Sequence, residues 1–320
     1  MLLTVILLIV ALVGLVITAD KFIEGSAAIA DNFGVAPIII GVTIIGLGTS
    51  APEMLVSGIA AWEGNVGLAV GNALGSNVAN IGLILGITLL IKPIAIQSSI
   101  FRCELPALMM VTFGSCLLVA DYSLDRIDGI VLLVFLLAFL AWLIRLCIKQ
   151  SQTDPIAQEI ESELPESMSN RMAAVWIIVG LVGLILSSKL LVWSAIMIAQ
   201  ALGVSDLIIG LSIIALGTSL PELAASVASV LKDNADMAVG NVIGSNIYNL
   251  AAVLSIPALV APTGLDAVIV ERDFLVMAIF TVLLFFLVVD VFRCGKLGRM
   301  SGLILLSLYL GYQFLLLDHV

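Results

Sequence analysis

Hydrophobic residues fill this chain in long runs that are separated by short polar stretches. Runs of such length can cross roughly 30 Å of hydrocarbon as α-helices. Only one polar stretch is extended, KQSQTDPIAQEIESELPESMSNR at 149–171. The pattern therefore predicts an all-α membrane protein with ten transmembrane helices, at 2–30, 36–60, 67–91, 104–120, 128–148, 172–202, 205–230, 236–260, 271–290 and 298–317.

Composition places the chain in a membrane rather than in water. Of its 320 residues, 62% are hydrophobic and 11% are charged, whereas charged residues make up about a quarter of a soluble domain. The formal net charge of −10 comes largely from loops, which indicates a solvated acidic linker. The N-terminus lacks a basic n-region and a small-residue cleavage site, so we expect the first hydrophobic run to stay attached as a spanning helix. We expect no cofactor, no nucleic-acid partner and no obligate protein partner.

An internal repeat organises the chain. GVTIIGLGTSAPEMLVS returns as GLSIIALGTSLPELAAS, and AVGNALGSNVAN returns as AVGNVIGSNIYN. The offset is the same throughout, since 222 minus 53 is 169 for the two glutamates and 249 minus 80 is 169 for two asparagines. We therefore predict two five-helix repeats with an acidic loop between them. Their limits are 1–148 with its motif at about 41–81, 149–171 for the loop, and 172–320 with its motif at about 210–250.

The repeats should have opposite orientations in the membrane. Each contains an odd number of predicted spans, so the second enters from the other side, as in the inverted repeats of secondary transporters. The positive-inside rule places both termini outside and the acidic loop in the cytoplasm, with only Arg126 and Arg272 clearly outside. The basic residues in or near cytoplasmic loops are then Lys92, Arg102, Arg145, Lys149, Arg171, Lys232, Arg293, Lys296 and Arg299.

A proline beside a glutamate interrupts the second and seventh predicted spans, in GTSAPE and GTSLPE. Proline lacks an N–H and clashes with the preceding turn, so each helix should break just before Pro52 and Pro221. The serine two residues before each proline matches the capping-box pattern of a new helix start. An ordinary kink would explain proline and serine, but not a carboxylate at bilayer depth, which costs about 2.5 kcal/mol or more if uncompensated. The motifs therefore mark Glu53 and Glu222 as functional.

Amide and hydroxyl side chains recur in the third and eighth predicted spans, in GNALGSNVAN and GNVIGSNIYN. Ser76 and Asn80 lie four residues apart and share one helix face, as do Ser245 and Asn249, and we expect these four to be ion ligands. Asn77 points elsewhere and is expected to form a helix–helix hydrogen bond. Packing between helices stays open as an alternative to ion binding for three further amides: Asn72, Asn241 and Asn246.

Together the motifs predict a midplane site with discontinuous helices 2, 3, 7 and 8 around it and with oxygen ligands only. No histidine or cysteine lies nearby, and the lone His319 is a tail residue. Oxygen ligands without nitrogen or sulfur favour hard cations such as Ca²⁺ and Na⁺. Two glutamates match the charge of one Ca²⁺ or of two monovalent ions, which favours exchange. The candidate groups are the side chains of Glu53, Glu222, Thr49, Thr218, Ser50, Ser219, Ser76, Ser245, Asn80 and Asn249, and freed carbonyls near Gly46 and Ala215.

At these motifs the chain resembles the sodium/calcium exchanger family, and most of all its short prokaryotic-type members. The family carries G-T-S-x-P-E on the second and seventh spans and G-N-x-x-G-S-N/C on the third and eighth, and both occur here twice in order. The resemblance implies a transporter of the prokaryotic inner membrane, not an enzyme, that exchanges Ca²⁺ for Na⁺ by alternating access. It also implies that the first and sixth spans slide against the others.

The resemblance further assigns roles to the candidate residues. It implies that Glu53 and Glu222 coordinate Ca²⁺ together with carbonyls beside Thr49 and Thr218, and that Na⁺ sites share these glutamates with the motif serines. Many family members have Asp at the position of Asn249. The amide here removes a third titratable carboxylate, leaves the stoichiometry open and argues against the potassium-dependent branch.

Other functions compete with sodium coupling at this point. A calcium/proton antiporter would let Glu53 and Glu222 carry protons in place of Na⁺. An intramembrane hydrolase is disfavoured because no buried His or Lys partners a serine as a base. A passive channel is disfavoured by the paired broken helices, which are typical of alternating access.

Overall fold

The computed structural model describes residues 2–34, 46–95, 101–150, 168–231, 235–294 and 296–317. Among these residues, eight helices are long and apolar enough to cross a membrane, or nine if a bent pair counts as one span. The predicted span at 36–60 is not counted, because its residues 36–45 lie outside the described residues. Residues 151–167 of the predicted acidic loop and His319 also lie outside them.

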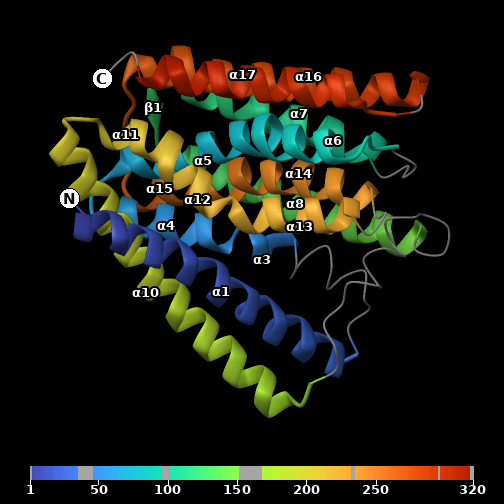
Figure 1. The fold of residues 1–320 in the computed structure, drawn as a ribbon, viewed down its shortest axis with the longest axis horizontal. Coiled ribbons are helices and arrows are strands. Elements are labelled where there is room, and N and C mark those ends of the chain that lie inside the picture. Colours follow the sequence, from blue (N-terminus) through green and yellow to red (C-terminus); the bar gives the residue numbers. More distant parts are fainter. Residues whose placement is uncertain are drawn as a thin grey trace.

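The helices pack side by side into an elongated bundle (Figure 1). The first half contains α1 (Leu2–Asn32), α3 (Gly46–Thr49), α4 (Ala51–Trp62), α5 (Val66–Ala79), η2 (Asn80–Leu85), α6 (Gly86–Ile91), α7 (Phe101–Leu118), η3 (Val119–Asp121) and α8 (Arg126–Gln150). The second half contains α10 (Asn170–Leu202), α11 (Asp206–Ile209), η4 (Gly210–Ile214), α12 (Ala215–Thr218), α13 (Leu220–Leu231), α14 (Ala235–Tyr248), η5 (Asn249–Val253), α15 (Ser255–Val260), η6 (Ile269–Phe274), α16 (Leu275–Cys294) and α17 (Arg299–Leu317). These bounds lie close to the predicted spans.

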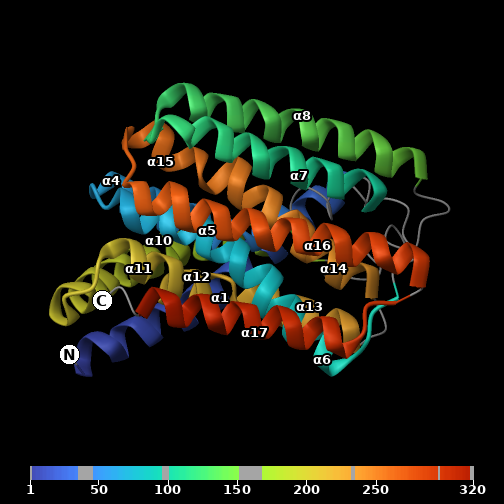
Figure 2. The same cartoon turned by 90° about the horizontal axis from the view of Figure 1, so that it is seen from above.

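Two spans form the centre of the bundle. Within their most apolar stretches, 78% of the residues of Val66–Ile91 and 83% of those of Met237–Val260 are buried, against 22–44% for the other candidate spans. Figure 2 shows α5 in the middle of the bundle, with α7 and α8 on one side and α17 on the other. Helix α5 packs closely against η4 because η4 has a glycine at the contact. A Cβ on Gly210 would lie 2.6 Å from the carbonyl oxygen of Leu68 on α5. The polar motifs of the third and eighth spans therefore lie in the interior.

The second and seventh spans break where the sequence predicts. Helix α3 ends at Thr49 and α4 begins at Ala51, and the pair Asp206–Thr218 and Leu220–Leu231 is bent by 42° around Ser219. Each proline is the second residue of the new helix, where a missing N–H costs nothing. The capping-box prediction is wrong at Ser50, whose side chain makes no capping hydrogen bond.

The third and eighth spans do not break, contrary to the prediction. Each continues through a π-helical turn, η2 or η5, and these turns begin at Asn80 and Asn249. Neither turn contains a proline, so every residue keeps its N–H and the wider π turn accommodates the distortion within a continuous helix. Such turns occur often at functional sites.

Helices α1 and α10 form a separate long pair that slants away from the bundle (Figure 1). They approach closely at glycine, since a Cβ on Gly25 would lie 2.6 Å from the carbonyl oxygen of Ala173. The Asn32 side chain also donates hydrogen bonds to Met168 O at 2.8 Å and to Asn170 Oδ1 at 2.7 Å. The two helices therefore contact each other along their length and at one end.

Short backbone contacts between the halves were not predicted. Strand β1 (Ser123–Leu124) pairs antiparallel with β2 (Thr263–Gly264). Elsewhere Ile94 and Leu297 exchange two backbone hydrogen bonds, of 3.0 and 2.7 Å. Each contact joins a loop of the first half to a loop of the second.

Candidate cation site

Two carboxylates lie in the interior of the bundle. Glu53 on α4 and Glu222 on α13 are 0% and 1% exposed, and each occupies the first turn after a helix break. The positive end of the helix dipole favours a carboxylate there. Neither forms a salt bridge within the described part of the chain. Burial without a cationic side chain leaves their charge to be compensated by something else.

Residues from the two sequence motifs meet at this point. The Ser219 hydroxyl donates to Glu53 Oε1 at 3.3 Å, so the second motif contacts the carboxylate of the first. A further contact between the halves is made by Thr218, whose hydroxyl donates to Asn72 Oδ1 at 3.1 Å. The tertiary structure thus brings together groups that lie about half the chain apart.

Two asparagines hold the half-helices in place. Asn72 Nδ2 donates to the Glu53 carbonyl oxygen at 3.2 Å and to Ser57 Oγ at 2.9 Å. In the second half, Asn241 Nδ2 donates to the Glu222 carbonyl oxygen at 3.1 Å and to a serine, Ser226, at 2.9 Å. Of the two open alternatives for these asparagines, the contacts match packing between helices. Sequence reasoning missed both serines, although each follows its glutamate by four residues.

Many oxygen atoms of the predicted ligands have no hydrogen-bond partner. Buried polar atoms in proteins are rarely left unpaired, because the loss of hydration is costly. Each of these orphan oxygen atoms can act as an acceptor, which a hard cation satisfies directly. They are Ser50 Oγ, Glu53 Oε2, Ser76 Oγ, Asn80 Oδ1, Glu222 Oε2, Ser245 Oγ and Asn249 Oδ1.

The other predicted groups differ from expectation in part. The Ala215 carbonyl accepts from Ser219 N at 3.2 Å and from Thr218 Oγ1 at 3.4 Å, so the break does not free it as predicted. Gly46 is the first residue of α3. The expected helix–helix hydrogen bond of Asn77 is absent, since neither of its amide atoms has a partner within the described residues.

The charged groups of the site are few. Among the described residues, His, Cys, Asp and Glu side chains form no metal-binding cluster of three or more members. Two glutamates therefore supply the charge, while hydroxyl and amide groups supply neutral oxygen. A multi-pass helix bundle that buries two carboxylates among such oxygens is a membrane transporter for cations.

Comparisons with known proteins agree with this class. The model of the family described as sodium/calcium exchanger protein matches residues 3–145 and 172–317, and the chain belongs to that family. It is 45% identical over 316 residues to the protein of Alkalimonas amylolytica that carries the name antiporter CaxA, covering 99% of both chains. It is 38% identical to inner membrane protein YrbG of Escherichia coli, covering 95% of this chain and 94% of that one.

A solved structure shares the whole fold. The sodium-calcium exchanger NCX_Mj superposes with a TM-score of 0.66 at 33% identity, covering 97% of both chains. The protein is therefore a membrane cation antiporter of the exchanger family, a transporter rather than an enzyme.

Proposed function

We infer that this antiporter exchanges Ca²⁺ for Na⁺ by alternating access and moves Ca²⁺ out of a prokaryotic cell across the inner membrane. The observation that carries this proposal is the set of orphan acceptor oxygens, contributed by both halves of the chain around Glu53 and Glu222. Buried carboxylates without a partner favour a bound cation, and flexible coordination by many oxygens suits Ca²⁺ better than Mg²⁺.

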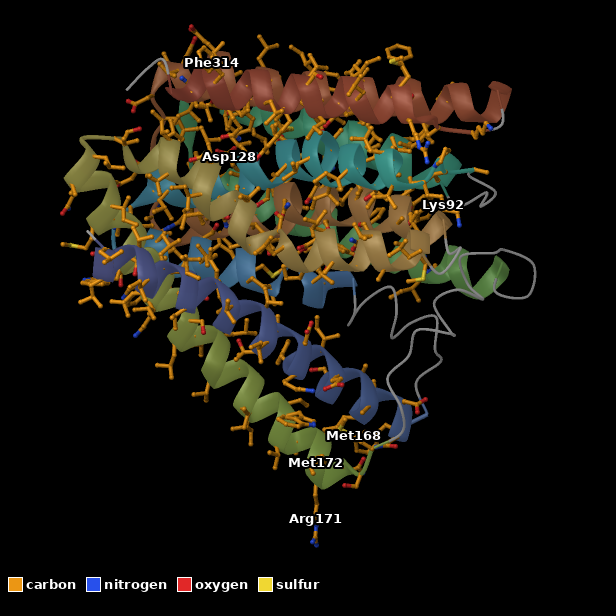
Figure 3. All side chains as sticks on the ribbon, viewed as in Figure 1. Lys92, Asp128, Met168, Arg171, Met172 and Phe314 are labelled. Carbon is orange, nitrogen blue, oxygen red and sulfur yellow. The ribbon has the colours of Figure 1, made fainter. Side chains whose placement is uncertain are left out.

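The proposed architecture is ten transmembrane helices in two inverted five-helix repeats. The first repeat is 1–148 and the second is 172–320, with the acidic loop 149–171 in the cytoplasm and both termini outside. Lys92 and Asp128 lie toward opposite ends of the bundle, and Arg171 projects from the start of α10 (Figure 3). The orientation follows from the positive-inside rule, which counts Lys and Arg near the ends of spans and assigns Lys92 and Arg171 to the cytoplasmic side.

The proposed ligands are those that the motifs and the family resemblance indicate. Glu53 and Glu222 bind Ca²⁺ between the two breaks, with carbonyls beside Thr49 and Thr218. Na⁺ ions occupy positions shared between these carboxylates and neutral oxygens of the motifs. The remaining proposed ligands are Ser50, Ser219, Ser76, Ser245, Asn80, Asn249 and the Gly46 carbonyl, whereas the Ala215 carbonyl is occupied by its two hydrogen bonds.

Exchange follows from the charge of the site. Two carboxylates in the interior cannot remain ionised and uncompensated while access to the site changes from one side of the membrane to the other. Release of one cation therefore requires binding of another. Sliding of α1 and α10 against the other helices is the proposed movement, since this pair slants away from the bundle (Figure 1).

Proteoliposomes test the coupling ion. Vesicles loaded with Na⁺ and diluted into Na⁺-free buffer with ⁴⁵Ca²⁺ should accumulate Ca²⁺, and a proton gradient alone should not drive uptake. Uptake driven only by the proton gradient would replace this proposal with a calcium/proton antiporter that protonates Glu53 and Glu222. Absence of Ca²⁺ movement under both gradients would refute Ca²⁺ transport altogether. Glu63→Gln, at an exposed glutamate near the end of α4, is the matched control.

A further inference from the structure

Asn77 is a buried amide without a partner. Its side chain is 1% exposed, and both Oδ1 and Nδ2 lack a hydrogen bond within the described residues. An amide has two donors and an acceptor, so full burial without any contact is unfavourable. Asn77 is not among the proposed ion ligands, which leaves its role unexplained by the site itself.

The internal repeat identifies the contact that Asn77 lacks. With the offset of 169, Asn77 corresponds to Asn246 and Asn80 corresponds to Asn249. Asn80 Nδ2 donates to Asn246 Oδ1 at 3.4 Å. The equivalent bond would run from Asn249 Nδ2 to Asn77 Oδ1. This bond is absent, since Asn77 Oδ1 accepts no hydrogen bond within the described residues.

This asymmetry is specific to contacts between the halves. Within each half, the asparagine that holds the half-helix makes the same two bonds, at 3.2 and 2.9 Å for Asn72 and at 3.1 and 2.9 Å for Asn241. Between the halves, Ser219 donates to Glu53 at 3.3 Å, whereas Ser50 Oγ, its equivalent, has no partner. The halves are therefore alike internally but differ in how each contacts the other.

We propose that Asn77 and Asn246 are positioning residues for the ion ligands. Asn246 orients Asn80 in the access state of this structure, and Asn77 orients Asn249 in the opposite state. This inference rests on the proposed function. The four amides lie on α5, η2, α14 and η5, which are among the helices that α1 and α10 slide against. In two inverted copies of one fold, the contacts of equivalent residues exchange when this movement changes the access state. In the opposite state Asn249 Nδ2 donates to Asn77, while the bond between Asn80 and Asn246 is released.

The bonded amide explains how a neighbour orients a ligand. Asn80 gives its N–H to Asn246, and its Oδ1 remains an acceptor without a protein partner. The carbonyl end of the amide is thereby available to a cation. Each access state then has one hydrogen-bonded amide pair and one pair without its bond. The two states therefore stay close in free energy, which allows rapid interconversion between them.

Leucine variants of the full-length protein test the proposal. Asn77→Leu removes an orphan amide, so it should raise the Tm of the ion-free protein in detergent, whereas Asn246→Leu should lower it by removing the acceptor of Asn80. Each single variant should exchange Ca²⁺ at least tenfold more slowly, because each favours one access state. The double variant should be faster than either single variant, because both states are then weakened equally.

The outcomes separate this inference from its alternatives. A Tm lowered by both variants would overturn it and make Asn77 an ordinary structural residue. Additive losses of exchange in the double variant, or wild-type exchange by Asn77→Leu, would also overturn it. If the wild-type protein moves no Ca²⁺, the proposed function fails, but the Tm measurements still test the pairing. Opposite Tm shifts in the two variants support the pairing, and equal shifts refute it.

Discussion

Ser219 donates a hydrogen bond to Glu53 Oε1 at 3.3 Å, while Ser50, its equivalent in the first half, has no partner. We therefore expect the two serines to respond differently to alanine. Ser219→Ala should lower the stability of the ion-free protein by about 1 kcal/mol, and Ser50→Ala should leave it unchanged or raise it. Thermal unfolding in a chelating buffer measures both. Equal destabilisation by the two variants would contradict the asymmetry.

Neutralising either buried glutamate should abolish Ca²⁺ transport. Glu53→Gln or Glu222→Gln keeps the side-chain volume but halves the charge available to a divalent ion. We expect Ca²⁺ uptake to fall to that of protein-free vesicles, with a folded, monodisperse protein by size-exclusion chromatography. Glu63→Gln should transport normally. Normal uptake by either buried variant would disprove the assignment of the site.

Calcium should stabilise the protein by mass action. Binding to the folded state alone contributes about 2.7 kcal/mol at a free concentration of 100 times Kd. A Ca²⁺ titration should therefore raise the Tm progressively, and Na⁺ should compete with this effect because both ions share the glutamates. The same titration of Glu222→Gln should show no shift. A shift that survives the substitution would place Ca²⁺ elsewhere.

Loss of Asn72 should disturb the fold around the first glutamate. Its amide binds Glu53 O and Ser57 Oγ, and it accepts from Thr218 Oγ1 at 3.1 Å. Asn72→Ala should cost about 1–3 kcal/mol of stability by leaving buried groups unpaired. Thermal unfolding together with calcium titration would show lower stability and weaker binding. Unchanged stability would mean that these bonds contribute nothing.

Close packing of the long helix pair should tolerate no added methyl group. A Cβ on Gly25 would lie 2.6 Å from Ala173 O, whereas one on Gly114 of α7 would meet no atom within 4 Å. Gly25→Ala should destabilise by about 1–3 kcal/mol through overpacking. Gly114→Ala should stabilise by up to about 1 kcal/mol, because alanine is the better helix former. Thermal unfolding of both variants compares them, and destabilisation of the same size in each would refute the packing argument.

Local chemistry explains why much of the architecture was predictable. Apolar runs of span length set the helix bounds, and Pro52 and Pro221 set the breaks, since proline removes a hydrogen-bond donor wherever it lies. The repeat offset paired Glu53 with Glu222 before any contact was known. The π-helical turns at Asn80 and Asn249 were missed because no residue type there forbids an ordinary helix.

The sequence by itself thus determined the spans, the duplicated motifs and the oxygen chemistry of the candidate site, because hydrophobicity and ligand type belong to individual residues. Only the tertiary structure decided which groups meet. It gave Asn72 one main-chain and two side-chain partners, left Asn77 with none and placed Ser219 rather than Ser50 on a glutamate. The reason is physical: hydrogen bonds act over about 3 Å, and such distances depend on how helices half a chain apart pack together.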